Sequence, residues 1–191
     1  MWHYSILSMK TNNGWISALE KLSKTFTDEF GSLTAEELNR KPNATTWSIG
    51  QVIDHIIVVN ESYYPVVEQL RAGTYRTPWT GRLPFLVNWF GDFILQGVEP
   101  KRKKKIKTFP VWEPQQSEVW GDIVEVFVDH HRELAGLIAA SSDLVEDGTV
   151  ISSPANRFIV YKIGKAFDIL VAHEERHLNQ AREVLGFLKK A

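Results

Sequence analysis

Apolar residues recur at intervals of three and four along four long segments of the chain. These segments cover residues 11–30, 47–73, 115–140 and 161–188. This spacing places the apolar side chains on one face of an α-helix. Alternating, strand-like patterns are sparse, and the run at residues 149–151 is too short to matter. Four amphipathic helices that must each bury a face predict an all-α fold, a four-helix bundle of antiparallel type.

Local signals place the ends and the interruptions of these helices. Ser48 is a good N-cap for the second helix, and Gln51, three residues later, can close a capping box. Pro65 lacks a backbone donor, so we expect a kink in the same helix between residues 61 and 65. The third helix is expected to bury Trp120 among its core residues.

A long connection over residues 73–114 separates the second helix from the third, and residues 83–95 within it form a candidate short helix. Its length predicts a crossover that carries the chain back along the bundle, so that helices 2 and 3 run parallel. Two roles are open for its apolar residues: they could cover the mouth of a site, or form the contact of a homodimer. These residues are Trp79, Phe85, Trp89 and Phe93.

The charge of the chain argues against nucleic acid and anionic membranes as partners. The formal net charge is −1, and the one strongly basic run, residues 101–107, has no basic surroundings to support it. We therefore interpret this run as a solvated loop rather than as an interaction module that binds nucleic acid.

The chain has the length of one domain, which we expect to span residues 1–191. No apolar run approaches the roughly 18–20 residues that cross a bilayer, and the first ten residues lack the features of a signal peptide. We expect a cytoplasmic protein. The absence of Cys excludes disulfides, thiolate metal ligands and a cysteine nucleophile.

Two of the six histidines, His173 and His177, lie four residues apart in the last helical segment. On a helix this spacing puts both imidazoles on one face, one turn apart, where they can share a metal ion. Glu174 falls on the same largely apolar face. Buried ionisable groups are paired, neutralised or bound to metal, because an unpaired buried charge costs several kcal/mol. The alternative is that both are core histidines bonded to their neighbours.

The same residues match H-E-x-x-H, the zinc metalloprotease pattern, with the glutamate as general base. The rest of the chain argues against a protease. Gln180 and Glu183 stand where the longer motif has Gly and His, and there is little strand to hold an extended peptide. A third ligand must then come from upstream. His55 is the best candidate and His131 the rival, ahead of His3 and His130.

The segment Thr46 to Ile56 reads TWSIGQVIDHI and resembles the W-S-x-x-x-x-x-x-H signature of the DinB-like (DinB/YfiT) superfamily. His173 to Gln180 resembles the second signature of that superfamily, H-x-x-x-H-x-x-Q. The resemblance covers nearly the whole chain. It implies a four-helix bundle with a crossover between helices 2 and 3, and a divalent metal, often nickel or zinc, on His55, His173 and His177. Family members often have Glu where this chain has Gln51.

Family members include thiol-dependent S-transferases and isomerases, and others are presumed to be metal-dependent hydrolases. The resemblance thus implies an enzyme whose metal activates water or a low-molecular-weight thiol for attack on a small electrophile. Glu174 could accept the proton, or could instead orient a ligand ring. Gln51 and His131 are candidates for supporting the ligands from behind. The alternative is a non-catalytic helical bundle whose metal is structural.

Overall fold

The computed structural model of the chain describes residues 11–100, 108–114 and 118–189. Helices dominate, as the sequence predicts, but a two-stranded hairpin is also present. The basic run at residues 101–107 lies outside the described residues. The elements in order are α1 (Asn12–Phe30), α2 (Ala35–Asn39), α3 (Ile49–Glu61), α4 (Tyr64–Arg71), η2 (Trp79–Arg82), α5 (Pro84–Val98), η3 (Pro110–Trp112), α6 (Ile123–Ala139), α7 (Ser142–Glu146), β1 (Val150–Ser153), β2 (Asn156–Lys162) and α8 (Ile163–Leu188).

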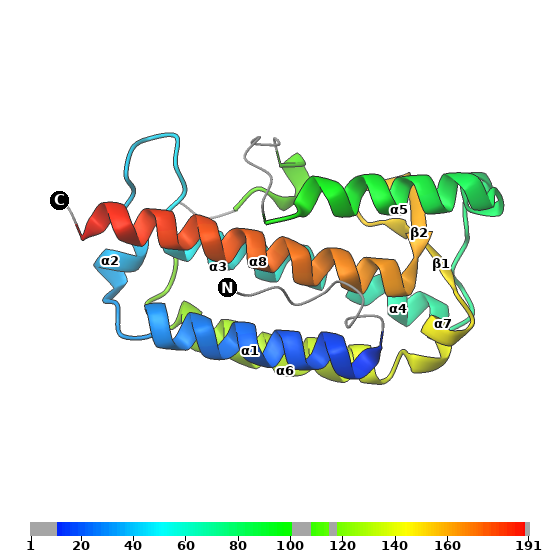
Figure 1. Cartoon of the computed structure of the whole chain (residues 1–191), viewed down its shortest axis with the longest axis horizontal. Helices are drawn as coiled ribbons and strands as arrows, with labels where there is room; N and C mark the ends of the chain where they lie inside the picture. The colour runs from blue at the N-terminus through cyan, green and yellow to red at the C-terminus, as the bar shows by residue number, and fades with distance from the viewer. Residues whose placement is uncertain (1–10, 101–107, 115–117, 190–191) are drawn as a thin grey trace.

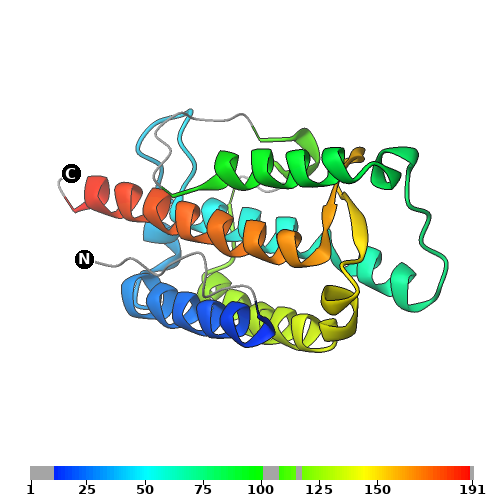
Figure 2. The same ribbon diagram turned by 45° about the vertical axis from the view of Figure 1, so that its right-hand side comes forward.

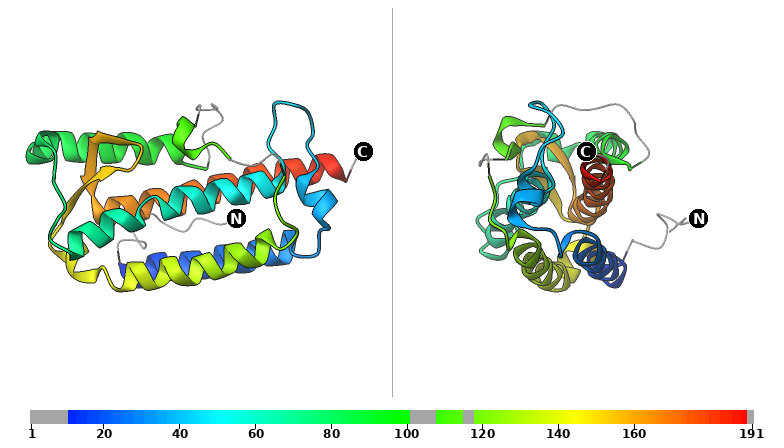
Figure 3. Two further views of the ribbon diagram at one scale, coloured as in Figure 1. Left: turned by 180° about the vertical axis from the view of Figure 1, so that it is seen from behind. Right: turned by 90° about the vertical axis from the view of Figure 1, so that its left-hand side faces the viewer.

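The long helices pack side by side in two pairs (Figures 1 and 3). Both α1 and α3 pack against α6 on one side and α8 on the other. The colours of Figure 1 show that α3 and α6 run in one direction and that α1 and α8 run in the opposite one. The helix α5 follows α4 in the sequence. It runs against the direction of α3 and carries the chain back along the molecule before α6 begins.

The apolar stripe of α1 faces the core along its whole length. The apolar residues at this spacing are buried: Trp15, Leu19, Leu22, Phe26 and Phe30. The Phe26 ring packs on Phe127 of α6 with centroids 4.5 Å apart. Each fully buried side chain of this size contributes about 1.5–3 kcal/mol, so the stripe accounts for much of the helix packing.

The second predicted helix is divided into α3 and α4. Ser48 and Gln51 form the predicted capping box: the Gln51 amide donates to Ser48 Oγ at 3.1 Å, and the Ser48 amide donates to Gln51 Oε1 at 3.2 Å. The helix is interrupted at Ser62 and Tyr63, and Pro65 lies in the first turn of α4. A proline is tolerated there because backbone N–H groups in the first turn of a helix have no acceptor within the helix. The N–H that proline lacks would therefore have made no helical hydrogen bond.

The third predicted helix starts later than its apolar pattern suggests, because α6 begins at Ile123. The Asn39 side chain holds the preceding backbone: it accepts from the Val119 amide at 2.7 Å and donates to the Val119 carbonyl at 2.9 Å. The expectation that Trp120 is a core residue is wrong, since its side chain is 75% exposed. Trp120 lies three residues before the helix start, so its side chain does not follow the helical stripe.

The strands β1 and β2 form an antiparallel hairpin that the sequence analysis did not predict. Ile151 pairs with Tyr161, and both side chains are buried. The packing of α5 and η2 on β2 supplies the cover that makes this short hairpin stable. Gly91 permits the close approach of α5, because a Cβ there would lie 2.9 Å from Lys165 Cγ.

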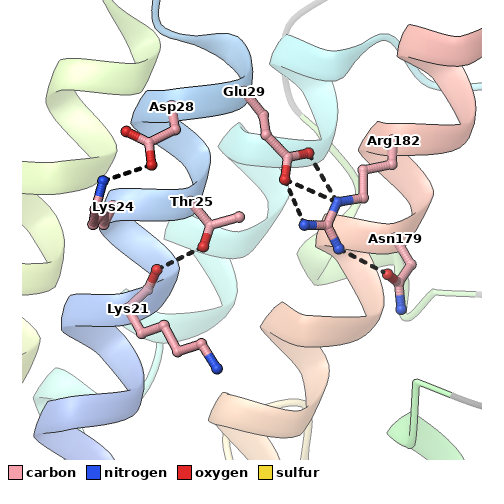
Figure 4. Close-up of polar contacts among 7 residues, drawn as sticks. All are labelled: Lys21, Lys24, Thr25, Asp28, Glu29, Asn179 and Arg182. Atoms are coloured by element: carbon pink, nitrogen blue, oxygen red, sulfur yellow. Dashed lines mark hydrogen bonds and ion pairs between the residues drawn. The ribbon is translucent and has the colours of Figure 1, made fainter. Parts of the chain in front are cut away.

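An ion pair at the surface joins α1 to α8 (Figure 4). Arg182 donates to both carboxylate oxygens of Glu29, from Nε to Oε2 at 2.8 Å and from Nη2 to Oε1 at 2.5 Å. This bidentate geometry restrains α8 about one turn beyond His177.

None of the described helices is long and apolar enough to cross a membrane.

Candidate metal centre

Three histidines from two helices meet between α3 and α8, which lie side by side in Figures 1 and 2. His55 lies in the middle of α3, and His173 and His177 lie one turn apart on α8. One ring nitrogen from each histidine lies within 4.8 Å of the other two. His55 and His177 are buried, and His173 is partly buried.

The nitrogen positions fit a transition-metal ion. Nε2 of His55 lies 3.2 Å from Nε2 of His173. Two imidazole nitrogens at 2.0–2.1 Å from a tetrahedral ion lie about 3.3 Å apart, so this pair is already at the separation of two ligands. The three ring centroids are 4.3 to 5.1 Å apart. A donor set of three imidazoles and no thiolate suits zinc, nickel, copper or iron.

The backbone of η3 fixes which nitrogen of His55 faces its partners. Nδ1 of His55 lies 2.6 Å from the carbonyl oxygen of Trp112. Since a carbonyl only accepts, Nδ1 carries the proton, and the lone pair of Nε2 points toward His173. Metal-binding histidines are oriented in this way, by a hydrogen bond from the nitrogen that does not bind the ion.

Burial keeps all three histidines neutral at physiological pH, the form that offers a lone pair. It lowers the pKa of His55 to about 4. It lowers the pKa of His177 to about 3, with smaller contributions from the charges of His55 and Arg176. It also drives the pKa of His173 well below 6.5, and the neighbouring histidines add to this shift. Protons therefore compete only weakly with a metal ion for the lone pairs of these imidazoles at neutral pH.

The histidines border an open pocket of about 1760 Å³. The Trp47 ring lies over two of them, 4.9 Å from the ring centroid of His55 and 6.3 Å from that of His177. Gln51 and Arg176 also line the pocket, and Nη1 of Arg176 donates to the Gly97 carbonyl at 2.9 Å. The pocket has room for a small substrate beside the histidines, between largely apolar walls.

A buried hydroxyl pair lines the same pocket. The hydroxyl oxygens of Tyr63 and Tyr161 are 2.7 Å apart, and both side chains are buried. Burial raises the pKa of Tyr161 to about 12 and that of Tyr63 well above 10, so both phenols stay protonated. They offer neutral hydrogen bonds rather than charge.

Glu174 faces away from the three histidines. Its side chain is fully buried, and its Oε1 accepts from Asn60 Nδ2 at 2.9 Å. Its Oε2 lies 3.0 Å from Nε2 of His131. Nδ1 of His131 in turn lies 2.7 Å from the Ser23 hydroxyl. The structure thus places His131, the rival ligand, in a separate polar cluster together with Glu174.

Two residues that shape these clusters, Trp112 and Asn60, were not predicted from the sequence. Trp112 acts through its backbone carbonyl, which leaves no signature in the sequence. Asn60 carries a partial signal, because a buried polar residue on the apolar side of a helix needs a partner. Its partner, Glu174, is 114 residues away and could not be read from α3 alone.

A protein-family model matches most of the chain. The family model of the DinB superfamily matches residues 18–181. The chain belongs to the DinB superfamily. The match extends from α1 into α8 and includes all three clustered histidines, so the resemblance drawn from the two sequence signatures is confirmed.

This DinB-superfamily chain is similar to the uncharacterized protein YuaE of Bacillus subtilis (strain 168). The two are 25% identical over 171 residues, which cover 86% of this chain and 93% of YuaE. No solved structure gives a significant match. The comparisons therefore assign a superfamily, and the residues of the site indicate its chemistry.

Proposed function

We propose that this DinB-superfamily chain is a metal-dependent enzyme. His55, His173 and His177 would hold one divalent transition-metal ion, nickel or zinc. The observation that carries the proposal is the convergence of three neutral imidazoles beside an open pocket, with two Nε2 atoms 3.2 Å apart. Such an ion, with a coordination position open to the pocket, lowers the pKa of a water or a thiol bound to it.

The residues around the histidines would orient the ligands and shape the substrate space. The Trp112 carbonyl holds the His55 ring through Nδ1, and the Trp47 ring packs over His55 and His177. The apolar pocket walls exclude water from one side of a bound substrate, and the hydroxyls of Tyr63 and Tyr161 offer it hydrogen bonds. We propose a small electrophile as the substrate, attacked by water or by a low-molecular-weight thiol.

The chain contains no Cys, so a thiol nucleophile has to come from a cosubstrate. A cytoplasmic location, where glutathione-like pools keep thiols reduced, would supply one. Glu174 enters the proposal in a positioning role, because its contacts are with Asn60 and His131. Proton acceptance by Glu174 would need the carboxylate to turn away from both.

Metal content tests the ligand set. Protein purified without an affinity tag is expected to contain about one transition-metal ion per chain, and His55→Ala should remove it. His131→Asn is the matched control, because it changes a buried histidine outside the cluster. If His55→Ala keeps its metal, or if His131→Asn loses it while remaining folded, the proposed ligand set is wrong.

Turnover tests the enzyme against the alternative of a structural metal. A panel of small electrophiles, each with water alone and with several low-molecular-weight thiols, should contain a pair that turns over. A chelator should abolish this turnover, and the added ion should restore it. If the metal-loaded protein is inert across the panel and the ion only raises Tm, the structural alternative is favoured. Turnover that resists the chelator would contradict the metal mechanism.

A further inference from the structure

The helix α5 lies at the edge of the molecule beside α8 (Figures 1 and 3). It carries a row of exposed aromatic rings. Phe85, Trp89 and Phe93 are 67%, 57% and 56% exposed. They are spaced by four residues and so form one ridge on the helix. The Trp89 and Phe93 rings stack, with centroids 5.5 Å apart and planes 15° apart. The proposed reaction does not account for this ridge.

The opposite side of α5 is firmly held in the fold. Val87 and Gly91 are buried against the hairpin and α8, and Gly91 permits close approach there. Lys165 of α8 forms an ion pair with Asp92 of α5 at 3.1 Å. The helix therefore cannot turn its aromatic side inward without breaking these contacts, and the ridge is a fixed part of the surface.

From the order of the rings we infer that α5 forms the interface of a homodimer, with the two copies of the helix antiparallel across a two-fold axis at Trp89. Phe85 and Phe93 stand four residues before and after Trp89, so the row reads the same in both directions. In such a pair Trp89 meets itself, and Phe85 of each copy meets Phe93 of the other. A two-fold axis pairs each residue of the row with its counterpart on the other copy, so this order sets aromatic rings against aromatic rings at all three positions.

The size of the aromatic surface fits a dimer. With about 200 Å² per ring, the three rings expose roughly 350 Å² of apolar surface. A standard interface takes about 800 Å² from each partner, somewhat more than half of it apolar. Leu86 and Phe90, which are partly buried, flank the ridge, and exposed Trp79 lies on η2, which packs against α5. Their exposed parts add to the apolar surface of the ridge.

The charges on this surface favour a second copy over a membrane. Arg82 and Asp92 are the charged residues of η2 and α5, one of each sign. Helices that lie on anionic membranes carry several Lys or Arg on their polar face. The net charge of −1 opposes self-association only weakly. Phe93 also lines the candidate site pocket, so the second copy would stand at the mouth of that pocket.

Sedimentation velocity of the full chain, from low to high micromolar concentration, tests the proposal. The wild type is expected to approach twice the mass of one chain. Trp89→Glu should raise the dimer dissociation constant at least about tenfold, since it places two carboxylates at the axis. Trp120→Glu, at an even more exposed tryptophan outside α5, should leave the dimer intact. Circular dichroism and Tm check that the variants are folded.

A charge-complementation experiment tests the antiparallel arrangement. Phe85→Lys/Phe93→Lys and Phe85→Glu/Phe93→Glu should each be monomeric, because like charges face each other across the axis. The two mixed together should form a heterodimer. Failure of the mixture to associate would overturn the arrangement about Trp89.

Other outcomes would overturn the interface itself. These are a wild type that stays monomeric at high micromolar concentration, or a dimer that survives Trp89→Glu and both double variants. A monomer that binds vesicles containing phosphatidylglycerol would instead identify the ridge as a membrane contact.

Discussion

Nε2 of His131 lies 3.0 Å from Oε2 of Glu174, with both side chains almost completely buried. The pair joins α6 to α8 in the core, and Asn60 extends it to α3 through its bond to Oε1 of Glu174. Three helices are thus connected through one carboxylate. This carboxylate directly follows His173 in the sequence, so the cluster also restrains the part of α8 that carries two of the three clustered histidines.

Removing one member of this pair is expected to cost more than removing both. His131→Leu removes one of the two contacts of the buried Glu174 carboxylate and leaves its Oε2 without a partner, which typically costs about 1–3 kcal/mol of unfolding free energy. The double variant His131→Leu/Glu174→Leu should recover part of that loss. Urea unfolding of the two single variants and the double variant measures the coupling. Strict additivity of the three values would contradict a direct interaction between the two residues.

The support of His55 by η3 predicts an effect on metal affinity from residues that bind no metal. Nε1 of Trp112 donates to Ser62 Oγ at 3.2 Å, which helps to hold the carbonyl that accepts from His55. Trp112→Phe and Ser62→Ala remove this bond and should weaken metal binding by about tenfold, the lower end of such effects. Competition with a chromophoric chelator measures the affinity. Ser142→Ala, in the exposed first turn of α7, serves as the control and should bind normally.

The stability of the protein should fall in mild acid because of His130. Burial lowers the pKa of this histidine to about 4, and the charge of His131 contributes. The unfolded chain binds the proton near pH 6.5 and the folded chain only near pH 4. The contribution of His130 to stability is therefore greatest above pH 6.5 and is lost as the pH falls from 6.5 to about 4.

For His130 alone the loss between pH 7 and pH 5 is expected to be about 2 kcal/mol. His130→Phe keeps a ring against Tyr64, which stacks on His130 with planes 11° apart, and removes the titrating group. Urea unfolding with a chelator present should therefore show a shallower loss in the variant than in the wild type. Equal losses would rule out His130 as a source of the acid sensitivity.

Two glycines in helices should respond oppositely to alanine. At Gly50 in α3 a Cβ would lie 2.1 Å from Val119 Cγ2 and 3.3 Å from the Leu38 carbonyl oxygen, so Gly50→Ala should destabilise by about 1–3 kcal/mol. At Gly136 in α6 a Cβ would meet nothing within 4 Å. Gly136→Ala should therefore stabilise by up to about 1 kcal/mol. Thermal unfolding compares the two, and a stabilising Gly50→Ala would contradict the packing described for Val119.

The helices were predictable because their signal is local. The stripe of α1 and the capping box of Ser48 and Gln51 depend on residues within a few positions of one another, and both are present as expected. The hairpin was not predictable in the same way. The burial of Ile151 and Tyr161 comes from α5 and η2 packing on β2, a tertiary contact that no short pattern records. Trp120 was misassigned because an apolar pattern was extended past the true start of α6.

The candidate site was only partly predictable. The spacing of His173 and His177 indicates a shared ion. The sequence pattern and the family signature both favoured His55 as the third ligand, but the pattern alone left His131 as a rival. The structure brings His55 to the pair and gives His131 to Glu174. The local patterns around His55 and His131 are alike, because each is a histidine on the apolar side of a helix. Which of them joins the pair depends on how the helices pack, and this is a long-range property.

The separation of His55 from His173 has a consequence for folding. The two residues are 118 positions apart, so holding them together closes a loop that includes most of the chain. Bringing together two residues this far apart in the sequence costs chain entropy, which rises with the logarithm of the loop length. The contact is also among the most non-local in the protein, and such contacts form late because loop closure must precede them. Refolding should therefore form the α3–α8 pair late.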